Sequence, residues 1–306
     1  MKARSISEKV YWLGTVDWER RLFDSLIPLP DGTSYNTYLI KGSEKTVLVD
    51  TADPRREKEF RAALQEIPQI DFVISHHVEQ DHSGLLAIVL EKYPEARVLC
   101  SDKAKPMLVD HLHLDPERIQ AVADGEKLSL GDLTLQFIYT PWVHWPETMC
   151  TYLMEEKILF SCDFFGSHLA TSELFATGPR VYEAAKRYFA EIMMPFRAAI
   201  EKNFEKLKPY PISIIAPSHG PVHRNPSFIL DAYREWVSGQ PKNLAVIPYV
   251  SMHDSTTRMV EFLTHKLVEN GVQVELFELT STDLGKLATN LVDAATIILG
   301  TPTVLA

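Results

Sequence analysis

The sequence is poor in cysteine and contains no long apolar run. Cys100, Cys150 and Cys162 are odd in number and lack CxxC spacing, which argues against a disulfide framework and a thiolate metal site. We expect Cys162 to be a buried small apolar residue. No stretch approaches the ~20 apolar residues of a membrane span, and the first residues lack the apolar segment of a signal peptide. We therefore expect a cytoplasmic protein without a membrane partner.

Basic residues are also in the minority. The chain has 31 Lys and Arg against 41 Asp and Glu, a formal charge of -10, and it shows no basic cluster. This composition argues against nucleic acid or an anionic membrane as a partner. The 306 residues, of which 45% are hydrophobic, are enough for about two domains. Repeated alternation of strand-like and helix-like segments indicates the α/β class.

The most informative segment is 77–82, with the sequence HVEQDH. It follows an apolar strand-like run at 70–75 and precedes a helix-like run at 83–90, so we predict that it lies on a strand-to-helix loop, where α/β folds present ligands. Alternate residues of an extended segment point the same way. His77 and Glu79 could therefore serve one metal ion, while the aspartate and the last histidine serve another.

Three later strand ends carry the same kind of residue. A predicted strand at 133–139 is followed by His144 between two prolines, the strand 157–163 ends in Asp163, and the strand 212–220 ends in a histidine, His219. A single strand-end histidine is more often a capping or surface residue than a ligand, but here segment 77–82 requires partners. We assign the capping or surface interpretation to the remaining histidines: His76, His111, His113, His168, His223, His253 and His265.

The donor types narrow the choice of metal. Histidines with several carboxylates and no thiolate suit iron or manganese at least as well as zinc. Asp163 is the candidate for a bridging carboxylate, which would hold two metal ions a few Å apart. Asp50 follows the strand 46–49, and two interpretations remain open for it: orientation of a ligand imidazole, or capping of the next turn.

With this spacing, the chain resembles the flavodiiron proteins (A-type flavoproteins), whose first domain has the metallo-β-lactamase fold. Segments 16–18, 33–40, 143–149 and 217–220 support the resemblance. The resemblance implies one iron held by His77, Glu79 and His144, a second held by Asp81, His82 and His219, and Asp163 as the bridge. Hydrolytic members of the wider fold usually have histidine at the position of Glu79, so this residue favours iron redox chemistry.

A second domain is predicted after residue 242. The helix-like segment 227–238 ends at Gly239-Gln240-Pro241, and a new strand–helix rhythm starts at Asn243, which predicts domains at 1–242 and 243–306. The hydroxyl-rich loop after the first new strand resembles the phosphate loop of flavodoxin-like domains, and the loop after the third resembles their flavin-ring loop. The FMN-binding residues implied are Ser251, Met252, His253, Asp254, Ser255, Thr256, Gly300, Thr301, Pro302 and Thr303.

The predicted fold class is α/β: a metallo-β-lactamase-like αββα sandwich followed by the N-terminal part of a flavodoxin-like doubly wound parallel sheet. Only three strands of the five in the order 2-1-3-4-5 can be counted, so we expect the chain to be incomplete beyond Ala306. Asp254 places a carboxylate where a phosphate should bind, which is repulsive unless the side chain turns away. FMN binding by these residues therefore stays open.

The resemblance implies an oxidoreductase that reduces O2 to water or NO to N2O at a non-heme diiron site fed by FMN. It also implies a head-to-tail homodimer or tetramer and a redox donor such as rubredoxin or a reduced deazaflavin. The resemblance does not fix the preferred gas. Asp24 stands where many members carry a histidine near the metal pocket, a departure that bears on the polarity and proton supply of the pocket but does not settle the selectivity.

Two alternatives remain open. A binuclear hydrolase of the metallo-β-lactamase superfamily would use a metal-bridging hydroxide and needs no flavin, but it leaves Glu79 and the flavodoxin-like segment unexplained. A non-catalytic diiron protein would bind O2 or NO without turnover.

Overall fold

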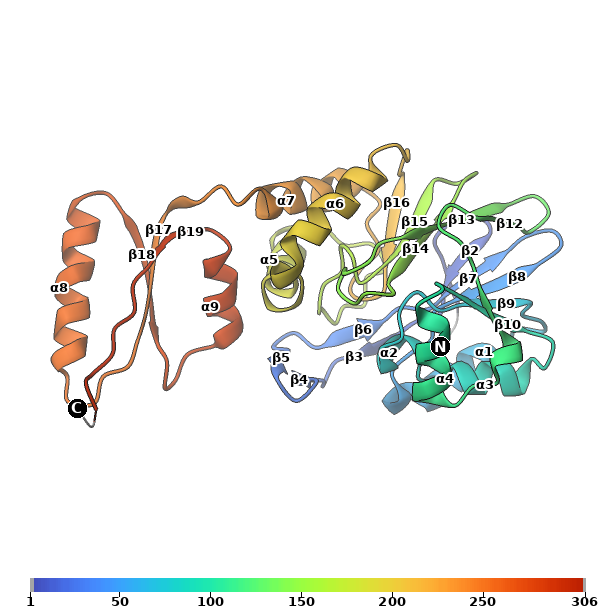
Figure 1. Ribbon diagram of the computed structural model, residues 1–306, viewed down its shortest axis with the longest axis horizontal. Helices are drawn as coiled ribbons and strands as arrows, with labels where there is room; N and C mark the ends of the chain where they lie inside the picture. Colours follow the sequence, from blue (N-terminus) through green and yellow to red (C-terminus); the bar gives the residue numbers. More distant parts are fainter. Residues whose placement is uncertain (1–2, 305–306) are drawn as a thin grey trace.

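The computed structural model describes residues 3–304. Two facing β-sheets with helices on their outer surfaces form the larger part, which we call the sandwich (residues 3–238), and a small three-stranded sheet with two helices forms the C-terminal unit (residues 242–304) (Figure 1). The predicted αββα sandwich is confirmed.

The first sheet of the sandwich has seven strands in the order β1-β2-β7-β8-β9-β10-β11. Strands β8 to β11 run parallel, and the remaining neighbours are antiparallel. The bounds are β1 (Arg4–Ser5), β2 (Val10–Trp12), β7 (Tyr38–Lys41), β8 (Thr46–Val49), β9 (Phe72–Ile74), β10 (Arg97–Cys100) and β11 (Ile119–Ala121). Its helices are η1 (Pro54–Arg56), α1 (Glu57–Leu64), α2 (Gln80–Ser83), α3 (Leu86–Lys92), α4 (Ala104–Leu112) and η2 (Pro116–Arg118).

The second sheet has five strands in the order β12-β13-β14-β15-β16. The bounds are β12 (Lys127–Ser129), β13 (Thr134–Tyr139), β14 (Met149–Leu153), β15 (Ile158–Cys162) and β16 (Ile214–Pro217). Two separate antiparallel pairs lie outside this sheet: β3 (Thr15–Asp17) with β6 (Thr33–Tyr35), and β4 (Leu22–Phe23) with β5 (Ile27–Pro28). The helices beside this sheet are α5 (Pro179–Tyr188), the π-helical turn η3 (Phe189–Met193), η4 (Met194–Phe196), α6 (Arg197–Leu207) and α7 (Pro226–Ser238).

Three apolar layers hold the sandwich together. In β8, Val47 and Val49 point into the layer between the two sheets, whereas Leu48 points into the layer beneath the helices of the first sheet. Both faces of this strand are therefore buried, as expected of parallel strands covered on two sides. A third layer, which contains Phe164, Tyr233 and Trp236, lies between the second sheet and α5 to α7.

The strand ends meet at one edge of the sandwich. His77, Asp163 and His219 all come shortly after a strand (β9, β15 and β16), so they are held by the sheet backbones. One detail differs from the sequence prediction: residues 80–83 form the helical turn α2 rather than loop, and the predicted helix at 83–90 is split. The split occurs at Gly84, where a Cβ would lie 2.5 Å from the Gln80 carbonyl oxygen.

The C-terminal unit is a parallel sheet in the order β18-β17-β19. Its elements are β17 (Lys242–Tyr249), α8 (Ser255–Glu269), β18 (Gln273–Glu278), α9 (Leu284–Leu291) and β19 (Ala294–Ile297). The order 2-1-3 is the one predicted for the start of a flavodoxin-like sheet. The predicted domain boundary coincides with the start of β17; that the two parts are separate folding units stays a prediction.

Helix α9 connects this unit to the sandwich. It packs against α5 and η3 (Figure 1), and Arg187 of α5 forms two hydrogen bonds, of 2.8 and 2.7 Å, with Asp283 at the start of α9. Lys186 and Asp293 add an ion pair of 2.6 Å. Within residues 3–304, none of the helices combines the length and the apolar character needed to cross a bilayer.

Candidate metal centre

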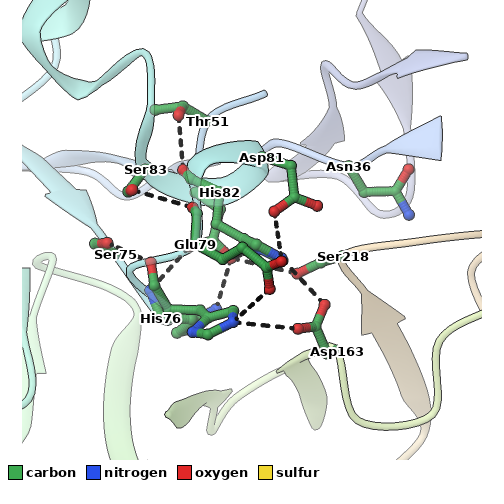
Figure 2. Close-up of polar contacts among 12 residues, drawn as sticks. Asn36, Thr51, Ser75, His76, Glu79, Asp81, His82, Ser83, Asp163 and Ser218 are labelled. Atoms are coloured by element: carbon green, nitrogen blue, oxygen red, sulfur yellow. Dashed lines mark hydrogen bonds and ion pairs between the residues drawn. The ribbon is translucent and has the colours of Figure 1, made fainter. Parts of the chain in front are cut away.

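All seven predicted ligand residues come together at the strand-end edge of the sandwich. Four of them, Glu79, Asp81, His82 and Asp163, are labelled in Figure 2, where their side chains point toward a common centre. The seven residues form two groups, each with donor atoms within 4.8 Å of one another: His77, Glu79, His144 and Asp163 in the first, and Asp81, His82 and His219 in the second.

The first group surrounds one carboxylate oxygen of Glu79. Its Oε2 atom lies 3.0 Å from His77 Nε2 and 3.4 Å from His144 Nε2. Asp163 Oδ2 lies 3.4 Å from His144 Nε2 and 3.8 Å from His77 Nε2. Two imidazoles and two carboxylates therefore direct their donor atoms at one small volume.

The second group is built in the same way around Asp81. Its Oδ2 atom lies 3.1 Å from His219 Nε2, and its Oδ1 atom lies 3.5 Å from His82 Nε2. The other oxygen of Asp163, Oδ1, lies 3.1 Å from His82 Nε2 and 3.3 Å from His219 Nε2. Asp163 thus turns one oxygen to each group, which is the arrangement of a carboxylate between two metal ions.

Several donor atoms in the centre have no hydrogen-bond partner among residues 3–304, although they are fully buried. These atoms are both carboxylate oxygens of Asp81, Oδ1 of Asp163 and Nε2 of His82. Leaving buried polar atoms unpaired costs free energy. Because their oppositely charged neighbours lie at about hydrogen-bond distance but outside hydrogen-bond geometry, the donor set fits cations bound between them better than direct pairing.

Burial and ion pairing within the centre shift the pKa values of its side chains. Burial lowers the pKa of His219, but contacts with Asp163 and Asp81 outweigh it and raise that pKa to about 10. The same competition raises the pKa of His144 to about 9. Burial acts to raise the pKa of Asp163, but the surrounding histidines outweigh this effect and hold that pKa well below its usual range. The carboxylates are therefore ready as anionic donors, and metal binding must displace protons from imidazoles.

Asp50 bonds to His76 rather than to a predicted ligand. His76 donates its backbone N–H to Asp50 Oδ1 at 2.8 Å, its Nδ1 lies 3.0 Å from Asp50 Oδ2, and its Nε2 lies 2.8 Å from Thr151 Oγ1. The distance from Asp50 Oδ2 to His82 Nδ1, 3.9 Å, is too long for a hydrogen bond. Asp50 thus braces the backbone just before the metal-binding segment.

The interpretation of the other histidines as capping or surface residues is wrong at three positions. His76, His168 and His223 are buried, whereas His111, His113, His253 and His265 are exposed, as predicted. Burial lowers the pKa of His223 to about 4, so this ring is a neutral core residue. Cys162 is buried, as predicted, together with the other two cysteines.

Two cavities flank Glu79. A small one of about 30 Å³ lies between Glu79, Asp163 and His219 on one side and His168 and Tyr188 on the other. His168 Nδ1 lies 2.8 Å from Thr33 Oγ1, and its Nε2 has no partner in the described chain. Such a volume holds one or two water-sized molecules.

The second cavity is open and much larger, about 1040 Å³. Glu79, Asp81 and Trp145 line its inner end, and Asp24 lines both cavities. Partial burial of Asp24, together with the neighbouring Glu79, raises the pKa of its carboxyl to about 6. The metal centre is therefore reached from a wide opening, whereas the inner space beside Asp163 is narrow.

The predicted FMN-binding loops come together at the carboxyl edge of the C-terminal sheet. Val250 donates its backbone N–H to the Gly300 carbonyl at 2.9 Å, which joins the loops after β17 and β19. A Cβ at Gly300 would lie 2.8 Å from the Tyr249 Cβ and 3.3 Å from the Thr256 methyl group, so the contact requires glycine. Asp254 lies just before α8 with φ +59°. These residues stay predicted ligands.

Two residues near the centre, His168 and Glu147, were not predicted from the sequence to belong to it. His168 lines the small cavity, and Glu147 contacts His77 from behind. Glu147 lies in segment 143–149, which supported the resemblance, but its partner is 70 positions away along the chain. Only its place three residues after a predicted ligand, between Pro146 and a strand, could have marked it.

The fold and the two donor groups define a metallo-β-lactamase-like protein with a site suited to two metal ions. A family model described as "ODP family beta lactamase" matches residues 33–220. A nitric oxide reductase of Moorella thermoacetica is 37% identical over 311 residues, which covers 98% of this chain and 77% of that protein. A coenzyme F420H(2) oxidase of Methanothermobacter marburgensis is 34% identical over 316 residues, which covers 99% of this chain and 78% of that protein.

Solved structures give the same result as these sequence comparisons. The rubredoxin oxygen:oxidoreductase of Desulfovibrio gigas matches with a TM-score of 0.95 at 30% identity, over 99% of this chain and 78% of that chain. This chain belongs to the flavodiiron (type A flavoprotein) family.

Proposed function

We propose that this protein is a flavodiiron oxidoreductase that reduces O2 to water, NO to N2O, or both. The observation that carries the proposal is the position of Asp163, whose two carboxylate oxygens face two separate groups of donors. In the ligand set we propose, His77, Glu79 and His144 hold one iron, Asp81, His82 and His219 hold the other, and Asp163 bridges them. A bridged pair of irons supplies the electrons for gas reduction when it is bound.

The surroundings of the centre support a small substrate. The cavity of about 30 Å³ beside Asp163 has room for a diatomic gas. His168 lines this cavity, and its Nε2 has no hydrogen-bond partner among residues 3–304. Burial holds the pKa of His168 well below its usual range. We propose that neutral His168 contacts the gas, and that Asp24, with its pKa of about 6, holds a proton near Glu79.

FMN is the proposed source of electrons. The loops 251–256 and 300–303 would hold it at the carboxyl edge of β17 and β19, with hydroxyl and backbone N–H groups available for a phosphate. In Figure 1 this edge lies at the lower end of the C-terminal unit, beside the C mark and away from α2. This separation supports a head-to-tail dimer or tetramer, in which the flavin of one subunit enters the large cavity of another.

The donor and the location are parts of the same proposal. Relatives are named nitric oxide reductase, coenzyme F420H(2) oxidase and rubredoxin oxygen:oxidoreductase. We propose a cytoplasmic enzyme that receives electrons from a reduced deazaflavin or from a rubredoxin. The names differ in substrate as well as in donor, so both gases belong in the test.

The test begins with composition. Metal and flavin are quantified in the purified protein, which is then reduced anaerobically with an artificial donor before consumption of NO and O2 is followed by electrode. We expect about two irons per chain and consumption of at least one gas, faster when FMN is added. Two zinc ions with esterase activity would instead establish the hydrolase alternative, and iron binding without turnover would establish the gas-binding alternative.

A further inference from the structure

Glu147 lies directly behind His77, on the side away from the metal centre. Its side chain is fully buried, and Oε1 accepts hydrogen bonds from His77 Nδ1 at 2.7 Å and from the Val78 backbone N–H at 3.1 Å. The Glu147 carbonyl oxygen accepts a hydrogen bond of 2.7 Å from Ser101 Oγ. The contact with Ser101 fixes the backbone of Glu147. Its carboxylate then connects the loop that carries His144 to the segment that carries His77.

The other three imidazoles of the centre lack this kind of support within residues 3–304. His219 donates from Nδ1 to the neutral carbonyl of Ser34 at 2.7 Å. The nearest carboxylate to His82 Nδ1, Asp50, is 3.9 Å away. His144 has no hydrogen bond on Nδ1 among the described residues. Among these four imidazoles, only His77 is hydrogen-bonded from behind to a buried carboxylate, and a carboxylate is costly to bury unless it is paired.

The contact determines which nitrogen of His77 is free. With its proton on Nδ1 and shared with Glu147, the ring leaves its lone pair on Nε2, the atom that faces Glu79 and Asp163. Trp145 packs edge-on against the ring at a centroid distance of 4.9 Å and limits its rotation. A hydrogen-bonded carboxylate also makes an imidazole a stronger donor.

We propose that Glu147 is a positioning residue that fixes the tautomer of His77 and strengthens its binding of the metal in the first group. The proposal rests on the metal centre described under the proposed function, but it requires no redox turnover. It also makes the two half-sites unequal, because an imidazole of the first group is hydrogen-bonded to a carboxylate at 2.7 Å, whereas the carboxylate nearest His82 Nδ1 in the second group is 3.9 Å away.

Three variants separate hydrogen bonding from charge. Glu147→Leu removes the acceptor at nearly the same volume. Glu147→Gln keeps an oxygen for His77 and Val78, and its NH2 group replaces Oε2, which has no partner in the described chain. Glu147→Asp keeps the charge but withdraws the oxygens by one methylene. Glu155→Leu is the matched control, because Glu155 is an exposed carboxylate that accepts a hydrogen bond from the Thr134 backbone N–H.

The readout is binding of Co(II) or Zn(II) to the apo full chain, by titration against a chelator, with circular dichroism to verify folding. We expect Glu147→Leu and Glu147→Asp to lower the binding affinity for one of the two metal ions roughly 10- to 100-fold. We expect Glu147→Gln to stay within a few-fold of wild type and Glu155→Leu to match it. If the leucine variant does not fold, the aspartate variant carries the comparison.

Equal affinities in all variants would overturn the role of Glu147, and so would equal weakening of both metals. Neither result touches the proposed function, which depends on iron content and gas consumption in the wild type. Conversely, a wild type that binds zinc and hydrolyses esters would refute the proposed function and leave the Glu147 comparison valid. For the iron-loaded protein, Glu147→Gln should shift the reduction potential of one iron upward, because a nearby negative charge is lost.

Discussion

At the scale of single residues, the centre depends most on Asp163. It is the residue whose two oxygens face different donor groups, with contacts of 3.1 to 3.4 Å to three imidazoles. Within residues 3–304, by contrast, the ion-pair contacts of Asp81 are with the two histidines of the second group. The two aspartates therefore allow a comparison between a shared and an unshared carboxylate.

We expect Asp163→Ala to lose both metals and all gas reduction, because each metal loses a donor and the bridge disappears. Asp81→Ala should weaken the second metal much more than the first. Metal content after gel filtration, measured by mass spectrometry, tests both variants. Retention of both metals and full activity by Asp163→Ala would show that the bridging assignment is wrong.

The sequence predicted residues whose chemistry is visible without the fold. His77, Glu79 and their partners stand out because histidines and carboxylates recur at strand ends. His76 and Glu147 did not stand out, because each is recognisable only by a bond to a residue far along the chain: His76 to Asp50 and Thr151, and Glu147 to His77. Burial of such polar residues is a tertiary property without a local pattern.

At the scale of elements, the contact between α9 and the α5–η3 segment contains a half-buried acid, Glu191. Glu191 of η3 accepts a hydrogen bond from Arg187 Nε at 3.1 Å, while the rest of that guanidinium is bound to Asp283. A Cβ at Gly285 would lie 2.0 Å from Glu191 Oε1, so a larger residue there would displace the ends of the Glu191 and Arg187 side chains. Burial, with a smaller effect of Asp283, raises the pKa of Glu191 to about 7, although Arg187 opposes the shift.

The raised pKa of Glu191 predicts that the protein loses folding stability as the pH rises. The folded protein binds the Glu191 proton more tightly than the unfolded chain, whose value is 4.5, so stability is lost as the pH rises from about 4.5 to about 7. Glu191→Gln removes this cost. We expect it to stabilise the protein by about 1 kcal/mol at pH 8, after allowance for partial solvent access, and to have little effect at pH 4.5.

Thermal unfolding of Glu191→Gln and wild type at the two pH values tests this, with Glu183→Gln on the exposed side of α5 as the control. Equal effects of Glu191→Gln at both pH values would contradict the assignment. Because η3 also supplies Ile192 to the lining of the small cavity, gas turnover of the same variants would show whether the α9 contact influences the centre.

Element boundaries were predictable where apolar periodicity was clear and less so where packing decides. The strands 133–139 and 157–163 agree with β13 and β15 within one residue. The split between α2 and α3 was missed, because it depends on the close approach of Pro54 and the Gln80 carbonyl to Gly84. That split turns Asp81 and His82 toward the centre on a short helical turn of their own.

At the scale of the whole molecule, metal binding and folding should be linked in the sandwich alone. The proposed ligands come from segments that span residues 77 to 219 and include both sheets, so a metal pair would cross-link the two halves of the sandwich. The C-terminal unit contributes no member of either donor group. Removal of metal should therefore destabilise one part of the molecule much more than the other.

Tryptophan fluorescence allows this to be measured. All five tryptophans (Trp12, Trp18, Trp142, Trp145 and Trp236) lie in the sandwich, whereas far-ultraviolet circular dichroism also reports α8 and α9. A ligand present at 100 times its dissociation constant stabilises the state it binds by about 2.7 kcal/mol. We expect chelation to lower the fluorescence-detected Tm by several degrees and readdition of Fe(II) to restore it. Asp163→Ala, which cannot hold the pair, should show neither response; an equal shift in that variant would show that the chelator acts elsewhere.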